Sequence, residues 1–162
     1  MSEDPSRLID IVPSAQGAVL SFDRCIAANA VLRERRQELL CQVVRVAKRA
    51  TVVRRVPGRD AVELADTSHV GKILPDIRLK VDSVAHRPCP PHMVDALLGI
   101  RSMERIRWTK DGRLGVAGSV PLRGASGAWC PVYKAVDIAA LAASKSIIED
   151  WRYRDALDRI RR

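Results

Sequence analysis

The chain has 162 residues, enough for one domain with an appendage or for two very small domains. Hydrophobic residues make up 47% and charged residues 29%, which excludes wholesale disorder, while an aromatic content of 4% argues against a stacking platform for single-stranded nucleic acid. Lys and Arg number 28 against 19 Asp and Glu, a net charge of +9, and 22 of the 28 cations are arginines.

This arginine excess suits a polyanionic partner, because guanidinium groups match phosphate oxygens and guanine edges with two parallel hydrogen bonds. A GC-rich genome is the alternative source, since it raises the Arg, Ala and Val content with no function attached. No apolar run approaches the ~18 residues of a membrane span, and the acidic start of the chain lacks the apolar core of a signal peptide. The four cysteines are scattered without a CxxC pair. We therefore expect a cytoplasmic, nucleoid-associated protein without membrane contact, metal or cofactor.

Residues 1–20 are expected to form a tail or a short docking strand around Leu8–Val12. Residues 21–87 are expected to form a helical N-terminal region with short strands. Its first helix follows Ser21 or Asp23 as N-cap, and either runs unbroken to about Ala50 or pauses at the polar run 33–38.

A short strand at 51–53 is expected next, closed by the turn signal Pro57-Gly58. Two short helices follow at 60–65 and 68–74, the second stopped by Pro75. Residues 77–84 alternate apolar and polar side chains, the period of a half-buried strand. The basic segment 45–59 is either a second DNA-contacting surface or a solvated helix end.

The stiff connector at 88–91 marks the main boundary, and residues 88–162 are the informative part. A short helix from His92 to Leu98 ends at Gly99, and a second helix starts at Ser102 as candidate N-cap and stops at Gly112. Strands at 116–122 and 130–133 flank a small-residue loop suited to a hairpin, and a long helix starts at Asp137. The expected fold is thus mainly α (α+β), with a C-terminal winged helix-turn-helix and a long last helix.

Residues 94–100, Val-Asp-Ala-Leu-Leu-Gly-Ile, resemble the first helix of the MerR-like winged helices, a family that includes phage and mobile-element excisionases. Residues 107–114, Arg-Trp-Thr-Lys-Asp-Gly-Arg-Leu, are similar to the Trp-x-(Lys/Arg)-x-Gly-x-Leu end of that family's recognition helix. Tyr133 and the segment 136–138, Val-Asp-Ile, are similar to the end of its wing and the start of its next helix. The match covers 92–143, under a third of the chain. Unlike the family, this chain has a polar residue, Arg105, three before the tryptophan, and it carries the domain last.

The resemblance implies a sequence-specific protein for double-stranded DNA, either a transcriptional regulator or a recombination accessory factor that bends DNA through adjacent copies. Base contacts are expected from the second helix and phosphate contacts from its end and the hairpin. A homodimer or a cooperative oligomer on DNA is expected, because two half-sites raise affinity. The expected DNA-contacting residues are Arg101, Ser102, Arg105, Arg107, Lys110, Arg113, Arg123 and Lys134.

Several alternatives stay open at this point. Trp108 is expected in the core, but Met103 and Ile106 offer a competing apolar face, so either face of helix 102–111 could be buried. His86, Cys89 and His92 have the side chains of zinc ligands, but they lack a fourth partner and are stiffened by prolines. No constellation of catalytic residues is recognisable, so we expect no enzyme. The second functional hypothesis is an interaction or assembly module of a phage or mobile element, and the third is RNA binding.

Overall fold

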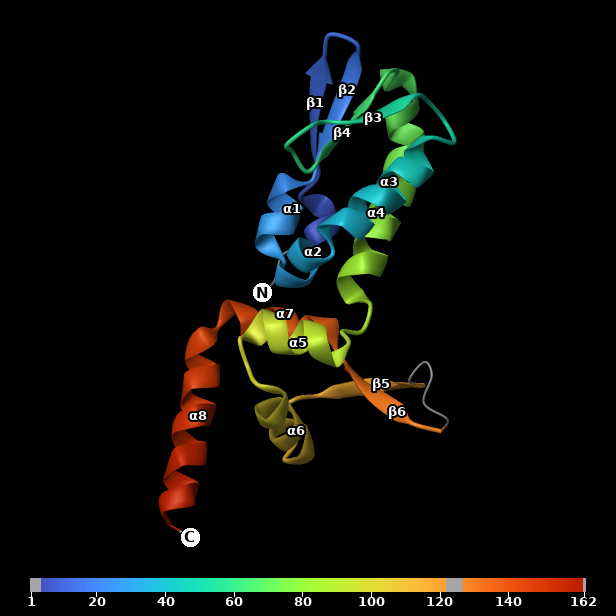
Figure 1. Ribbon diagram of the computed structural model, residues 1–162. Helices are drawn as coiled ribbons and strands as arrows, with labels where there is room; N and C mark the ends of the chain where they lie inside the picture. Colours follow the sequence, from blue (N-terminus) through green and yellow to red (C-terminus); the bar gives the residue numbers. More distant parts are fainter. Residues whose placement is uncertain (1–3, 122–126, 162) are drawn as a thin grey trace. The chain divides into compact units, whose positions relative to one another are not determined.

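The computed structural model describes residues 4–121 and 127–161 and divides the chain into two compact units (Figure 1). The N-terminal unit is Met1–His86 and the C-terminal unit is Arg87–Arg162. The expected boundary at residue 88 lies next to this division. The chain is a mixed α+β protein with small antiparallel sheets, and 58% of the described residues are helical and 19% are in strands.

The N-terminal unit contains a four-stranded antiparallel sheet made of β1 (Asp10–Ser14), β2 (Gly17–Ser21), β3 (Val53–Arg55) and β4 (Ala61–Leu64), in the order β1-β2-β4-β3. Of the two alternatives for 1–20, the tail is wrong and the strand is correct, because 10–14, which overlaps the strand expected around Leu8–Val12, pairs with 17–21 as a hairpin. The helix expected at 60–65 is also wrong. This segment is a strand with neighbours on both sides, and this pairing outweighs the weak helical preference of a four-residue stretch.

Three helices occupy the region expected to be one long or interrupted helix: α1 (Asp23–Ala28), α2 (Ala30–Glu34) and α3 (Arg36–Ala47). The break before α2 falls at Asn29, whose backbone is extended and whose side-chain oxygen accepts hydrogen bonds from the amides of Val31 and Leu32 at 2.9 and 3.1 Å. Asn29 therefore caps a new helix instead of continuing the first. A second break, at Arg35 between α2 and α3, falls within the polar run 33–38, so of the two alternatives the interrupted helix is correct.

Helix α4 (Val70–His86) corrects the two remaining expectations, a helix stopped by Pro75 and a strand over 77–84. Pro75 lies inside the helix. Buried Ile73, Ile77 and Val81 are spaced by four residues, whereas Leu79 is 65% exposed. A spacing of four fits both a strand and a helix, so the alternation at 77–81 did not distinguish them.

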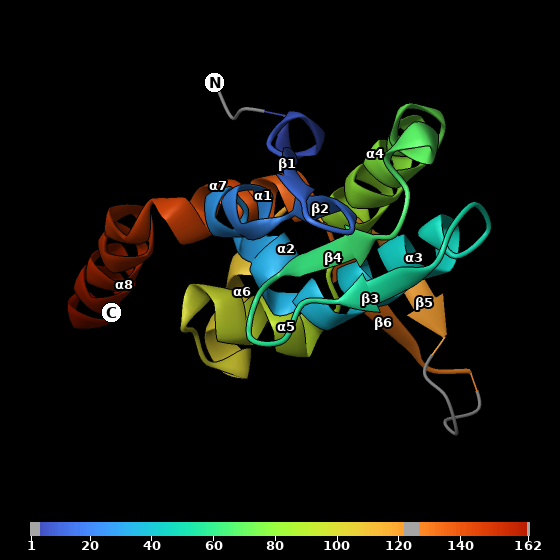
Figure 2. The same cartoon turned by 90° about the horizontal axis from the view of Figure 1, so that it is seen from above.

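The core of the N-terminal unit forms where the sheet packs against α3 and α4, as Figure 2 shows from above. Leu20 and Phe22 at the end of β2 and Val62 in β4 are fully buried there, together with Leu39 of α3 and Ile77 of α4. Short 3₁₀ turns at Pro5–Arg7 and Thr67–His69 precede β1 and α4.

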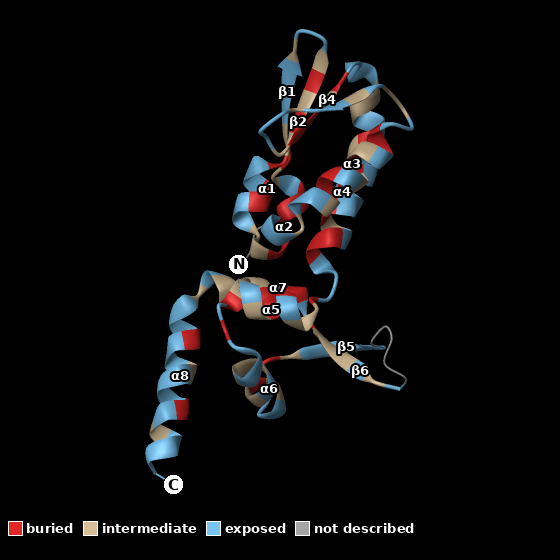
Figure 3. Ribbon diagram, viewed as in Figure 1, coloured by how far each residue is buried: buried red, intermediate tan, exposed pale blue. Residues whose placement is uncertain are grey.

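The C-terminal unit contains α5 (Pro91–Leu98), α6 (Ser102–Lys110), the hairpin β5 (Val116–Pro121) and β6 (Trp129–Tyr133), α7 (Ala135–Ala143) and α8 (Lys145–Ile160). The predicted elements are present and in the predicted order, except that the long last helix is divided at Ser144. Gly99 turns the chain after α5 with a φ of +61°, a conformation that glycine adopts without strain. The buried residues of this unit include several on α5, α7 and α8 and Trp108 on α6, and Figure 3 marks buried positions in red.

Within the described ranges, no helix is long and apolar enough to cross a membrane.

Candidate nucleic-acid interface

Helix α6 has one face turned into the C-terminal unit and one turned to solvent. Trp108 is fully buried, whereas Met103 is 74% exposed and Ile106 is also exposed. The tryptophan face is thus the buried one, which settles the alternative left open by the sequence. Ser102 is the first residue of the helix and not its N-cap. Arg101 takes the N-cap position, and its amide donates to the carboxylate of Glu104 at 2.8 Å.

Arg105 lies on the inner side of α6 and ties it to α5 and the hairpin. Its Nε donates to Asp95 Oδ1 at 2.8 Å and its Nη1 to the Tyr133 hydroxyl at 3.2 Å, with only 11% of the side chain exposed. Ser102 donates to the other oxygen of the same Asp95 at 2.9 Å, and the Thr109 hydroxyl lies 3.0 Å from that of Tyr133. Burial lowers the pKa of Arg105, but the bonds to Tyr133 and Asp95 outweigh it and leave the pKa raised. In this structure the expected base contact of Arg105 is replaced by internal bonds.

Asp155 of α8 is a buried carboxylate that holds α6 and α8 together. It accepts from Trp108 Nε1 at 2.8 Å, from Arg113 Nη2 at 2.7 Å and from Arg107 Nη2 at 2.7 Å. Burial raises its pKa, but the bonds from Arg113 and Trp108 and the nearby positive charges outweigh burial and lower it below 3.8. Asp155 is therefore ionised at neutral pH and acts as the counter-ion of two arginines.

The ring of Trp151 completes this cluster. It meets Trp108 edge to face, with centroids 5.0 Å apart and planes at 74°. The Arg113 guanidinium lies over both rings, at 5.5 Å from Trp108 and 5.7 Å from Trp151. It also pairs with Asp111, and the bond from Arg113 lowers the pKa of that carboxyl. Arg113 is thus held by two carboxylates and two rings, a geometry that fits a structural role better than a free phosphate contact.

The remaining residues expected to contact DNA form fewer bonds within the protein. Arg101, Lys110 and Lys134 are exposed, and their side chains form no ion pair within the ranges that the structure describes. Arg107 is intermediate, with 39% of its side chain exposed despite the bond to Asp155. Arg123 lies outside the described residues.

The hairpin projects as a two-stranded ribbon with all six residues of β5 exposed. At its base Tyr133 is fully buried and its backbone exchanges hydrogen bonds with Cys89 at 2.8 and 2.9 Å. Trp129, paired with Pro121 toward the far end, is 64% exposed. The base is therefore anchored while the far end is open to solvent.

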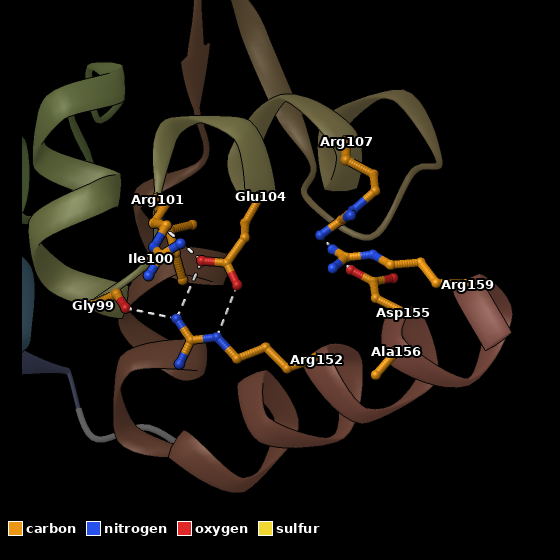
Figure 4. Close-up of a pocket in the computed structure, with 9 residues that line it drawn as sticks. All are labelled: Gly99, Ile100, Arg101, Glu104, Arg107, Arg152, Asp155, Ala156 and Arg159. Carbon is orange, nitrogen blue, oxygen red and sulfur yellow. Dashed lines mark hydrogen bonds and ion pairs between the residues drawn. The ribbon is translucent and has the colours of Figure 1, made fainter.

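A pocket of about 580 Å³ lies between α6 and α8 (Figure 4). Arg152 crosses it, donating to Glu104 at 2.8 and 3.2 Å and to the carbonyl of Gly99 at 2.8 Å. The bond from Arg152 lowers the pKa of Glu104 against the opposing effect of burial. The pocket is lined by Gly99, Ile100, Arg101, Glu104, Arg107, Arg152, Asp155, Ala156 and Arg159.

The sequence interpretation expected Ile148 and Trp151 of the last helix either to dock on the winged domain or to pair with a second chain, and it missed the contribution of Asp155. A signal was present: Ile148, Trp151 and Asp155 are spaced by three and four residues, so a carboxylate continues an apolar helical stripe. An acidic residue on a buried stripe needs a partner of opposite charge, and an arginine or a tryptophan N–H meets this need.

Among the residues that the structure describes, no group of three or more His, Cys, Asp or Glu side chains could hold a metal ion. Cys89 is fully buried, and its backbone is bridged to Tyr133. The basic segment 45–59 belongs to the N-terminal unit, where Arg55 donates to Gln37 Oε1 at 3.0 Å.

Comparison with protein-family models, with curated proteins and with solved structures gave no match. The resemblance to the MerR-like winged helices therefore rests on the sequence motifs.

Proposed function

We propose that the chain is a sequence-specific binding protein for double-stranded DNA and that its C-terminal unit is a winged helix-turn-helix. The order helix, tight turn, helix, hairpin, helix supports this proposal. So does the distribution of charge, since the C-terminal unit carries a formal charge of +6 and the N-terminal unit +3. A positive unit with a projecting hairpin suits phosphate contact.

The observation that carries the proposal is the two-sided character of α6. Its inner face is fixed by Trp108 and Arg105, which leaves the opposite face open along the whole helix. A rigid helix with a free outer face fits the major groove, about 12 Å wide. In this proposal Ser102 and Lys110 approach base edges, and Arg101, Arg107, Lys134 and Arg123 contact phosphates. Arg105 and Arg113 hold α6 in position.

Binding of a random duplex library at several salt concentrations tests the proposal. The affinity for selected duplexes should fall steeply as salt rises. If Lys110 contacts a phosphate, Lys110→Ala should reduce the slope of log K against log salt by about 0.9, the value for one lost phosphate contact. If Lys110 reads a base, the same variant should change the selected sequence. Lys145→Ala, which removes the same charge from an exposed position on α8, is the matched control. Absence of duplex binding at 50 mM salt would overturn the proposal.

Binding to DNA would place the protein in the cytoplasm beside the nucleoid, as a transcriptional regulator or a recombination accessory factor. A dimer or a cooperative oligomer would match paired half-sites. Sedimentation with and without a selected duplex tests this part, since one monomer per duplex at micromolar concentration would contradict it.

One observation favours a second function, an interaction module in which α6 docks a protein. Met103 and Ile106 are apolar side chains on the outer face of α6, and large exposed apolar side chains are common at protein interfaces. Met103→Ser separates the two functions. It should leave the salt slope of duplex binding unchanged if DNA is the partner, because methionine carries no charge.

A further inference from the structure

The pocket between α6 and α8 has more positive charge on its walls than its carboxylates can compensate. Four arginines face two carboxylates there, and Figure 4 shows Arg107 and Arg159 reaching toward one another above Asp155. Like charges repel one another unless an anion lies between them. The wall of the pocket therefore carries positive charge that its own carboxylates do not neutralise.

The hydrogen bonds and ion pairs at the pocket show which arginines are paired with a carboxylate and which are not. Glu104 is occupied by Arg152 through both oxygens, and Asp155 by Arg107, Arg113 and Trp108. Arg101 and Arg159 form no ion pair within the described part of the chain. Two guanidinium groups at the pocket are thus available to a ligand.

Arg107 supplies an independent observation. Its Nε is buried and has no hydrogen-bond partner within the described residues, although its Nη2 is bonded to Asp155. A buried N–H group without an acceptor destabilises the fold, and a charged donor does so more strongly. A ligand oxygen would satisfy this Nε once the guanidinium turns it toward the pocket.

We propose that the pocket binds a phosphate group, with Arg101, Arg107 and Arg159 as its ligands. Three guanidinium forks match the oxygens of a phosphate, whereas a carboxylate has only two oxygens. A volume of about 580 Å³ exceeds a single phosphate, so the group would be part of a larger molecule. The phosphate could belong to the DNA backbone, in which case the inference rests on the proposed function, or to a free phosphorylated ligand.

The test uses the full chain, two probes and two matched variants. Arg159→Gln removes one proposed ligand that forms no ion pair, so the fold should be retained. Arg154→Gln removes the same charge from the same helix, at a side chain that is 71% exposed and lies 3.8 Å from Asp150. The first arm measures binding of inorganic phosphate through the melting temperature at constant ionic strength. The second measures the salt dependence of duplex binding.

In the first arm, phosphate should raise the melting temperature of the wild type and of Arg154→Gln, and bind about tenfold more weakly to Arg159→Gln. In the second, a backbone phosphate in the pocket should make the salt slope of Arg159→Gln smaller by about 0.9 than that of Arg154→Gln. An effect in the first arm alone identifies a free phosphorylated ligand as the source.

Equal behaviour of the two variants in both arms would overturn the inference. The outcomes also separate this inference from the proposed function. A phosphate effect specific to Arg159→Gln with no duplex binding by any variant keeps the pocket and rejects the DNA-binding function. Duplex binding that is equal in both variants, with no phosphate effect, rejects the pocket and keeps the function.

Discussion

Removal of the Asp155 carboxylate should destabilise the C-terminal unit more than the loss of any exposed charge. The change Asp155→Ala leaves the N–H of Trp108 without an acceptor inside the core and leaves Arg107 and Arg113 without this counter-ion. An orphaned buried donor costs about 1–3 kcal/mol, and breaking a fully buried ion pair costs about 3–5 kcal/mol.

The side chains of Arg107 and Arg113 are 39% and 24% exposed, so water replaces part of what they lose. The expected cost is therefore at the lower end, about 3 kcal/mol. Small domains have a free energy of unfolding of about 0.05–0.15 kcal/mol per residue, so a unit of this size would lose a large part of its stability.

Tryptophan fluorescence in urea is a selective assay, because all three tryptophans of the chain lie in the C-terminal unit. With an m-value of about 1 kcal/mol/M, the unfolding midpoint should fall by about 3 M urea. Asp155→Asn should fall between the wild type and the alanine variant, because the amide oxygen can still accept from Trp108.

Asp150→Ala is the control, since the Asp150 side chain lies on the same helix and is 71% exposed. Its effect should stay within about 0.5 kcal/mol. A loss below 1 kcal/mol for Asp155→Ala, or one equal to that of Asp150→Ala, would refute the role given to the buried carboxylate.

Three further predictions concern pH, thiol reactivity and backbone packing. Because the pKa of Asp155 is lowered below 3.8 on folding, its contribution is present above that pH and is lost below it, so the urea midpoint followed by tryptophan fluorescence should be constant from pH 7 to 5 and fall below about pH 4. Burial raises the pKa of Cys25 to about 12, so a thiol reagent at pH 8 should label exposed Cys41 in the folded protein and Cys25 only after urea is added, and labelling of both at one rate would contradict this. Gly17→Ala would place a Cβ 1.9 Å from the carbonyl oxygen of Leu64, so the N-terminal unit should lose about 3 kcal/mol or more by circular dichroism while the tryptophan signal keeps its midpoint.

The elements of the C-terminal unit could be predicted because strong local signals bound them. Pro91 starts α5, and Gly99 and Gly112 follow the two helices with positive φ angles. Such residues limit the backbone whatever surrounds them, so one sequence is enough to locate them.

The elements of the N-terminal unit depend on tertiary contacts, and this explains the errors there. β4 is a strand because β2 and β3 pair with it, and β2 lies tens of residues earlier in the sequence. Pro75 inside α4 broke the local pattern although the buried stripe continues past it. In both segments the local sequence pattern favours the wrong structure, and no other local feature corrects it.

In the candidate site, too, the local sequence does not determine the roles of single residues. Arg105 and Arg101 are both arginines near the start of α6, and nothing local distinguishes them. Asp95 decides their roles, because it lies on the facing side of α5 and takes Arg105 as its partner. A charged residue's function thus depends on which opposite charges the fold brings near it.

Because carboxylates within the fold pair with some of the arginines, the net charge of +9 does not by itself show how much positive charge is free for binding. In the C-terminal unit, carboxylates hold Arg105, Arg107, Arg113 and Arg152. These arginines join α5, α6 and α8, so replacing one of them would weaken the proposed DNA binding through loss of structure as well as through loss of charge. The cations that can report on binding alone are those that form no ion pair in the part of the chain that the structure describes, and they include Arg101, Lys110, Lys134 and Arg159. These four belong to α6 and its N-cap, to the residue after the hairpin, or to the pocket wall, so part of the charge that remains for a polyanion lies around α6, while exposed Lys145 of α8 adds a further cation in the same unit.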